Sequence, residues 1–211
     1  MLIRKALSAE RFESYRKQPG DSDETIFLRY QWNASVCEGF YSPLRLLEVV
    51  LRNSFDRSLS ERAGIGPNWL TTVPQWLQEN GRADVGKAHD FLTQRRMAIT
   101  QPRMVQEMSF GFWTSLLNSR YETLFHGIGA KVFPGMPKPI RTRAIASVRF
   151  EEIRTLRNRI FHFRRIWNRP NLSKDYNEIL ESIEWVNPDA RRLLLPPDSA
   201  ARFLEVLARQ P

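Results

Sequence analysis

Three residues in the last third of the chain have types and spacing that suit acid–base chemistry on a phosphate. They are Arg157, Asn158 and His162, in the order Arg-Asn-x-x-x-His. An imidazole with a pKa near 6.5 can accept or donate a proton at neutral pH, and a guanidinium binds phosphate oxygens. Cleavage of RNA by its own 2′-OH needs a base, an acid and positive charge on the phosphorane, and needs no metal. The three residues fit that reaction.

The pattern around these residues predicts one long helix over about 140–168 that would position them. At about 100° per residue, one apolar stripe is expected to enter the core, formed by Ile153, Leu156, Ile160, Phe163 and Trp167. The residues expected to face away from that stripe are Arg154, Arg157, Asn158, Phe161, His162, Arg164 and Arg165. Asn158 precedes His162 by four residues, so we expect it to orient the imidazole ring.

Positive charge is concentrated in the same segment. The chain has 211 residues, with 32 Lys+Arg against 23 Asp+Glu and a formal charge of +9. Residues 141–170 hold 9 basic and 2 acidic side chains, which accounts for +7 of that total. A basic stretch indicates an anionic partner, most often nucleic acid. A solvated Arg-rich helix face and a structural histidine are the alternatives that charge and periodicity leave open.

One histidine cannot serve as base and acid at the same time. Two copies of the helix meeting across a two-fold axis would place two His162 and two Arg157 side chains in one cleft. We therefore expect a homodimer with RNA as its partner, and a dimer contact on the exposed ring of Phe161.

Other chemistries lack a pattern in this sequence. His89 and His126 have no recognisable metal-ligand spacing, and there is no phosphate-binding glycine-rich loop and no G-x-S-x-G motif, so we expect no metal and no cofactor. The lone Cys37 excludes a disulfide framework and permits a reducing compartment. Because no secretion leader or membrane-spanning run is visible, we expect a cytoplasmic protein.

The helical period recurs throughout, and strand signals are scarce. The sequence predicts a single all-α bundle over residues 1–211 with peripheral N- and C-terminal helices. Ser42-Pro43 reads as the start of a new helix, and 127–139 reads as a Gly/Pro loop. The expected helices cover about 9–17, 22–40, 43–63, 82–98, 102–116, 140–168, 173–186 and 198–208.

The Arg157–His162 string resembles the R-N-x-x-x-H signature of the HEPN superfamily, and the rest of the chain resembles its Abi-like (abortive infection) branch. The resemblance covers about residues 8–187 and leaves 188–211 as a C-terminal helical extension. Its other elements, in order, are Tyr30–Asn33, Leu44–Asn53 with Glu48, Arg52 and Asn53, Trp69, Met108–Trp113 with Leu116, and Ile183–Trp185.

The resemblance implies an all-helical HEPN fold, a homodimer with facing R-x4-H motifs, and metal-independent endoribonuclease activity in bacterial defence or a toxin–antitoxin system. Arg157 and His162 would be catalytic, and Asn158 would orient or bind. Glu48, Arg52 and Asn53 would form a supporting patch, although Glu48 and Arg52 at i, i+4 equally fit a plain ion pair. Arg154, Arg164 and Arg165 are expected to bind flanking phosphates.

The sequence leaves two points open. Relatives commonly have Glu-Pro where this chain has Arg164-Arg165, which makes the rim more basic and leaves the role of that acid in doubt. A non-catalytic RNA- or protein-binding module paired with an antitoxin protein is the alternative function. The sequence does not indicate which RNA is cut, or whether an antitoxin or a phage trigger controls the protein.

Overall fold

The computed structural model describes residues 2–194 and 199–211, and these residues form helices and loops without a β-strand. The predicted all-α class is confirmed. The α-helices are α1 (Leu2–Leu7), α2 (Ala9–Glu13), α3 (Asp23–Ser60), α4 (Glu79–Gln94), α5 (Gln101–Glu107), α6 (Phe110–Ser115), α7 (Glu122–Val132), α8 (Arg143–Phe161), α9 (Leu172–Val186) and α10 (Ser199–Ala208). Three short 3-10 helices are η1 (Ser119–Tyr121), η2 (Lys138–Ile140) and η3 (Ala190–Leu193).

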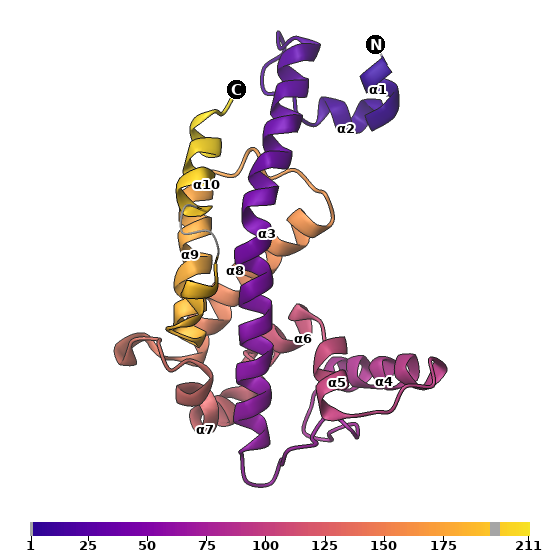
Figure 1. Ribbon diagram of the computed structural model, residues 1–211, viewed down its shortest axis with the longest axis vertical. Coiled ribbons are helices and arrows are strands. Elements are labelled where there is room, and N and C mark those ends of the chain that lie inside the picture. Colours follow the sequence, from indigo (N-terminus) through magenta and orange to yellow (C-terminus); the bar gives the residue numbers. More distant parts are fainter. Residues whose placement is uncertain (1, 195–198) are drawn as a thin grey trace.

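Helix α3 is the axis of the molecule, with α9 and α10 along one side and α4, α5 and α6 on the other (Figure 1). The prediction of two helices separated at Ser42-Pro43 is wrong, because the helix continues through Pro43. An interior proline costs about 3 kcal/mol. Phe40 and Leu44, on either side of it, are fully or almost fully buried, and their packing outweighs that cost.

The C-terminal extension is part of the core. The ring of Phe203 in α10 stacks on Tyr176 at 4.1 Å between centroids and contacts the edge of Phe40 at 4.9 Å. This contact needs a glycine in α3, since a Cβ at Gly39 would lie 2.5 Å from the Phe203 ring. The indole N–H of Trp32 also donates to the carbonyl of Val206 at 2.7 Å. Residues 199–211 thus close one side of the bundle.

The tryptophan-rich connector between α3 and α4 folds back over the core, as predicted. Trp69 is buried, its ring meets Trp113 edge-on at 6.0 Å, and its indole N–H donates to the carboxylate of Asp56 at 2.9 Å. One continuous cluster of buried apolar side chains joins this connector to the helices around α3.

Several predicted boundaries are wrong. Residues 127–132 are helical in α7, where the ring of Phe125 fills the space a Cβ of Gly129 would need. The segment predicted as one helix over 102–116 is two, because the chain turns at Ser109 and its hydroxyl caps α6 by accepting from the Phe112 N–H. Helix α1 was not predicted. The last predicted helix begins at Asp198, which lies outside the described residues, and the described part starts at Ser199.

None of the helices in the described part of the chain combines the length and the apolar character that a membrane crossing requires.

Candidate active site

Helix α8 ends seven residues earlier than the sequence predicts, at Phe161, and His162 is its C-cap. Of the expected helix over 140–168, the part observed is Arg143–Phe161, which includes Arg157 and Asn158. The predicted positions of His162, Arg164 and Arg165 on the helical face are wrong, because these residues follow the end of the helix. Ile153, Leu156 and Ile160 are buried as predicted.

The end of α8 is a Schellman turn built on an aromatic residue. The N–H of Phe163 donates to the carbonyl of Ile160 at 3.0 Å, and the N–H of Arg164 donates to that of Arg159 at 2.7 Å. Phe163 has φ 54°, in the left-handed region that usually selects glycine, at a cost of about 1–2 kcal/mol. Its side chain is 69% exposed, so the prediction that it belongs to the core stripe is wrong.

The segment after the turn is fixed by side chains from α2 and α8. Arg11 donates to the carbonyl of Phe163 at 2.6 Å, and Arg159 donates to that of Arg165 at 2.8 Å. The guanidinium of Arg165 in turn donates to the carbonyl of Ser14. These bonds hold the backbone on the C-terminal side of His162 in one conformation.

Buried Asn33 of α3 also holds the segment that follows the turn. Its side-chain oxygen accepts from the backbone N–H of Ile166 at 2.8 Å and from that of Trp167 at 2.9 Å. Two buried amide groups are satisfied by one carboxamide, which gives Asn33 a structural role close to the candidate site.

Arg157 is held by three neighbours. Its Nη2 lies 3.2 Å from Oε2 of Glu48 in α3, and its Nη1 donates to Oδ1 of Asn158 at 3.4 Å. The guanidinium carbon lies 4.5 Å from the ring centroid of Phe161, a cation–π contact. The Arg157 and Glu48 side chains are both about a quarter exposed, and Nε of Arg157 is buried without an acceptor.

The supporting patch is only partly assembled. Glu48 pairs with Arg157, and no ion pair joins it to Arg52 within residues 2–194 and 199–211, so the i, i+4 interpretation is wrong. Arg52 lies one turn further along α3, half-buried, with its Nε also buried and lacking an acceptor. Asn53 is exposed on a different face of α3, and no hydrogen bond connects its side chain to Glu48 or Arg157.

His162 is exposed at the C-terminus of α8, and its backbone N–H donates to the carbonyl of Asn158 at 3.1 Å. No hydrogen bond joins the Asn158 side chain to the His162 ring among the described residues, so the expected orientation of the ring is not present; the Asn158 amide oxygen accepts from Arg157. The exposed imidazole is accessible to a substrate.

The three remaining arginines predicted to bind phosphate, Arg154, Arg164 and Arg165, differ in their contacts. Arg154 pairs with Glu151 one turn earlier, at 2.9 Å, and lines a polar cavity beside α6. The pKa of Arg154 is raised, first by that hydrogen bond. Arg164 is exposed directly after Phe163, and Arg165 is occupied with Ser14. Of these three, Arg164 has the side chain best placed to meet a substrate near His162.

The ring of Phe161 is only partly available as a dimer contact. It is 36% exposed, and its edge and face already meet Tyr41, at 5.3 Å between centroids, and Arg157. Through this contact with Phe161, Tyr41 connects Arg157 to α3. Sequence reasoning missed this residue, although its separation of seven from Glu48 places both on one face of a helix.

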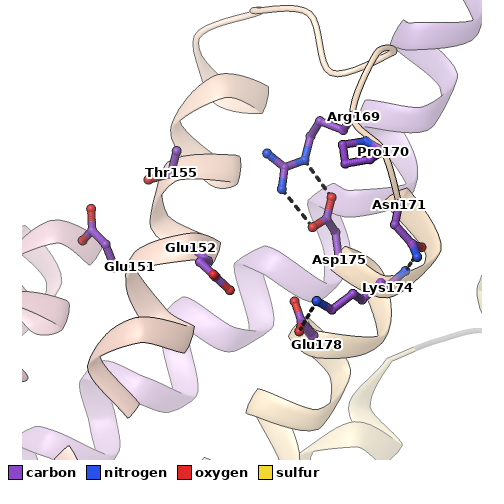
Figure 2. A pocket seen from close by; sticks show the side chains of 9 residues that line it. All are labelled: Glu151, Glu152, Thr155, Arg169, Pro170, Asn171, Lys174, Asp175 and Glu178. Carbon is purple, nitrogen blue, oxygen red and sulfur yellow. Dashed lines mark hydrogen bonds and ion pairs between the residues drawn. The ribbon is translucent and has the colours of Figure 1, made fainter. Parts of the chain in front are cut away.

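A second charged pocket lies between α8 and α9, and its cations are paired within it (Figure 2). Arg169 binds Asp175 through two hydrogen bonds of 2.7 and 2.9 Å, and Lys174 lies 3.7 Å from Glu178. These contacts fix the start of α9. The described residues contain no group of three or more His, Cys, Asp and Glu side chains that could hold a metal ion.

The other two histidines have local contacts. The Nε2 atom of His89 lies 2.9 Å from the carbonyl of Leu70, and that of His126 lies 3.2 Å from the carboxylate of Glu122, one turn earlier in α7. Neither His89 nor His126 has a hydrogen bond or an ion pair with Glu48 or Arg157.

Comparisons with protein-family models, with curated proteins and with solved structures give no match to this chain.

Proposed function

We propose that this protein is a metal-independent endoribonuclease of a bacterial defence (abortive infection) or toxin–antitoxin system. It works as a homodimer, and RNA is its substrate. The observation that carries the proposal is that an exposed His162 caps the end of the helix whose Arg157, five residues earlier, has its guanidinium held by Glu48 and Phe161. The resemblance to Abi-like HEPN proteins supports the same chemistry.

In the proposed reaction one His162 removes the proton of a 2′-hydroxyl, and that oxygen attacks the adjacent phosphorus. The P–O5′ bond breaks, and the second His162 protonates the leaving oxygen. The products are a 2′,3′-cyclic phosphate and a 5′-hydroxyl. Arg157 stabilises the additional negative charge on the phosphorane, helped by Arg52 one turn from Glu48. Arg164 binds a flanking phosphate.

Glu48 acts as a positioning residue in this scheme. Its carboxylate holds one side of the Arg157 guanidinium. The buried Nε atom of Arg157 has no acceptor among the described residues. A held arginine loses less conformational freedom when it meets the phosphate.

The test is incubation of wild type and the His162→Ala variant with single-stranded and structured RNA in excess EDTA. We expect wild type to release fragments with 2′,3′-cyclic phosphate ends and the variant to release none. The competing function, a non-catalytic RNA- or protein-binding module paired with an antitoxin, is favoured by the existing contacts of Arg157 with Glu48 and Asn158. It predicts RNA binding without cleavage, equal for both proteins.

A further inference from the structure

A pocket of about 230 Å³ opens on α3 beside the end of α8. Tyr30, Cys37, Glu38 and Tyr41 line it from one face of α3, and Phe163 lines it from the Schellman turn. Its walls are mainly aromatic and aliphatic, and Arg11, Asn33 and Glu38 are the polar residues among them. The pocket is smaller than the 300–1,000 Å³ typical of drug-sized ligands, so it suits one flat ring system.

The aromatic ring of Phe163 is exposed, and the backbone of this residue has a left-handed conformation that costs free energy. A left-handed residue at this position of a helix end is normally glycine, and here a large apolar side chain stands 69% exposed instead. Four hydrogen bonds hold the backbone on either side of it: those of Arg11, Arg159, the Phe163 N–H and the Arg164 N–H. Strain of this kind without a packing gain is typical of a functional position.

Two residues that line the pocket are neighbours of the candidate active site. Phe163 directly follows His162, and Tyr41 lines the pocket while its ring contacts Phe161, which carries the Arg157 guanidinium. A group bound in the pocket therefore lies next to the residues that would act on a phosphate. Arg11 also lines the pocket and supplies a cation there.

We propose that this pocket holds one unpaired nucleobase of the RNA, stacked on the ring of Phe163 next to the phosphate at which His162 acts as general base or acid. The inference rests on the proposed function. Base–aromatic stacking is a common means by which proteins bind single-stranded RNA, and paired bases cannot enter because their faces are covered in the duplex. The preferred substrate is therefore RNA that is single-stranded at the cleavage site.

The experiment measures binding of a fluorescent single-stranded oligoribonucleotide and of the matching duplex, with the His162→Ala protein as the uncleaving parent. Adding Phe163→Gly removes the ring and relieves the left-handed backbone. We expect about 5- to 100-fold weaker binding of the single strand, with the duplex affinity unchanged and a Tm that stays equal or rises by about 2–4 °C. Phe163→Tyr keeps an aromatic face and should bind like the parent.

The matched control is Phe91→Ala, which removes an equally apolar ring from α4, where it contacts Arg95. This variant should leave RNA affinity unchanged. Equal single-strand affinity of the Phe163→Gly protein and its parent would overturn the inference. So would conversion of a dimer to a monomer by Phe163→Gly, since the ring would then be a contact between copies.

Failure of the pocket and failure of the nuclease are distinguishable. His162-dependent cleavage by an otherwise wild-type Phe163→Gly protein at the wild-type rate overturns the pocket alone. Weaker single-strand binding by Phe163→Gly, with no cleavage by wild type, supports the pocket and overturns the nuclease.

Discussion

Glu48 and Arg157 lie 109 positions apart in the chain, and the Oε2 and Nη2 atoms of their side chains are 3.2 Å apart. The pair joins the middle of α3 to the last turn of α8. It is the only ion pair of either side chain in the described residues, and it holds one side of the Arg157 guanidinium.

The Glu48→Gln variant should lose RNA cleavage without losing its fold. Without the carboxylate, Arg157 adopts other rotamers, and we expect the cleavage rate to fall about 10- to 100-fold. The free energy of unfolding should change by less than about 1 kcal/mol, because both side chains are partly exposed. Initial rates and urea denaturation of the same preparations measure the two quantities.

Glu61→Gln is the matched control for that variant. Glu61 forms an exposed ion pair with Lys131 at 2.9 Å, beyond the last residue of α3. The Glu61→Gln variant should cleave RNA at the wild-type rate. A Glu48→Gln rate equal to that of Glu61→Gln would contradict the positioning role.

Asn33→Ala should destabilise the protein and disorganise the segment after His162. Two buried amide N–H groups, those of Ile166 and Trp167, would lose their acceptor, at a cost of about 2–4 kcal/mol in the free energy of unfolding. Chemical denaturation measures this cost. Asn177→Ala, on the exposed side of α9, should change stability by less than about 0.5 kcal/mol. Similar values for the two variants would show that Asn33 does not hold this segment.

Two helical glycines should respond to alanine with opposite signs. Gly39→Ala should destabilise by about 1–3 kcal/mol, because its Cβ would displace the Phe203 ring from between Tyr176 and Phe40. Gly86→Ala in α4 meets no atom within 4 Å and should stabilise by up to about 1 kcal/mol. Thermal unfolding of both variants measures the difference, and a stabilising Gly39→Ala would mean that α10 does not pack on α3 as described.

The sequence predicted the helical elements better than their ends. Apolar stripes at a period of 3.6 predict helices over both halves of α3 and over α8, because each helix must bury one face, and Ser173 and Pro188 mark the two ends of α9. Local signals misled where tertiary packing dominates. Ser42-Pro43 has the pattern of a helix start, yet the buried residues around Pro43 keep α3 continuous.

The end of α8 was beyond sequence reasoning for a different reason. Phe163 fits the apolar stripe and is not a usual left-handed residue, so nothing in the local pattern marks a helix end. The bonds that impose the turn come from Arg11, Asn33 and Ser14, which lie more than 130 positions away. The Arg157–Asn158 part of the site was predictable, and the placement of His162 was not.

Acid should weaken the fold through Asp21. Its carboxylate accepts from the Arg29 guanidinium and from the backbone N–H groups of Lys17 and Gln18, which hold its pKa well below the usual range. Because the unfolded chain binds the proton first, stability present at neutral pH is lost as pH falls below about 4. Asp21→Asn should lower the Tm at pH 7 and reduce its dependence on pH in the acid range.

Thermal unfolding from about pH 7 to pH 2 tests this linkage, with Asp84→Asn as the control. Asp84 forms an exposed contact with Lys87 at 3.6 Å, and its variant should give a Tm profile parallel to that of wild type. An Asp21→Asn profile that is also parallel would contradict the assignment.

The most direct measurement for the proposed function is the RNA cleavage rate, in excess EDTA, of wild type mixed with His162→Ala at constant total protein. If each cleft needs two His162 side chains, only wild-type homodimers cleave, and an equal mixture should retain about one quarter of the wild-type rate. A rate of about one half would mean that each protomer acts alone. A rate that does not fall with added His162→Ala, or an absence of cleavage by wild type, would contradict the account.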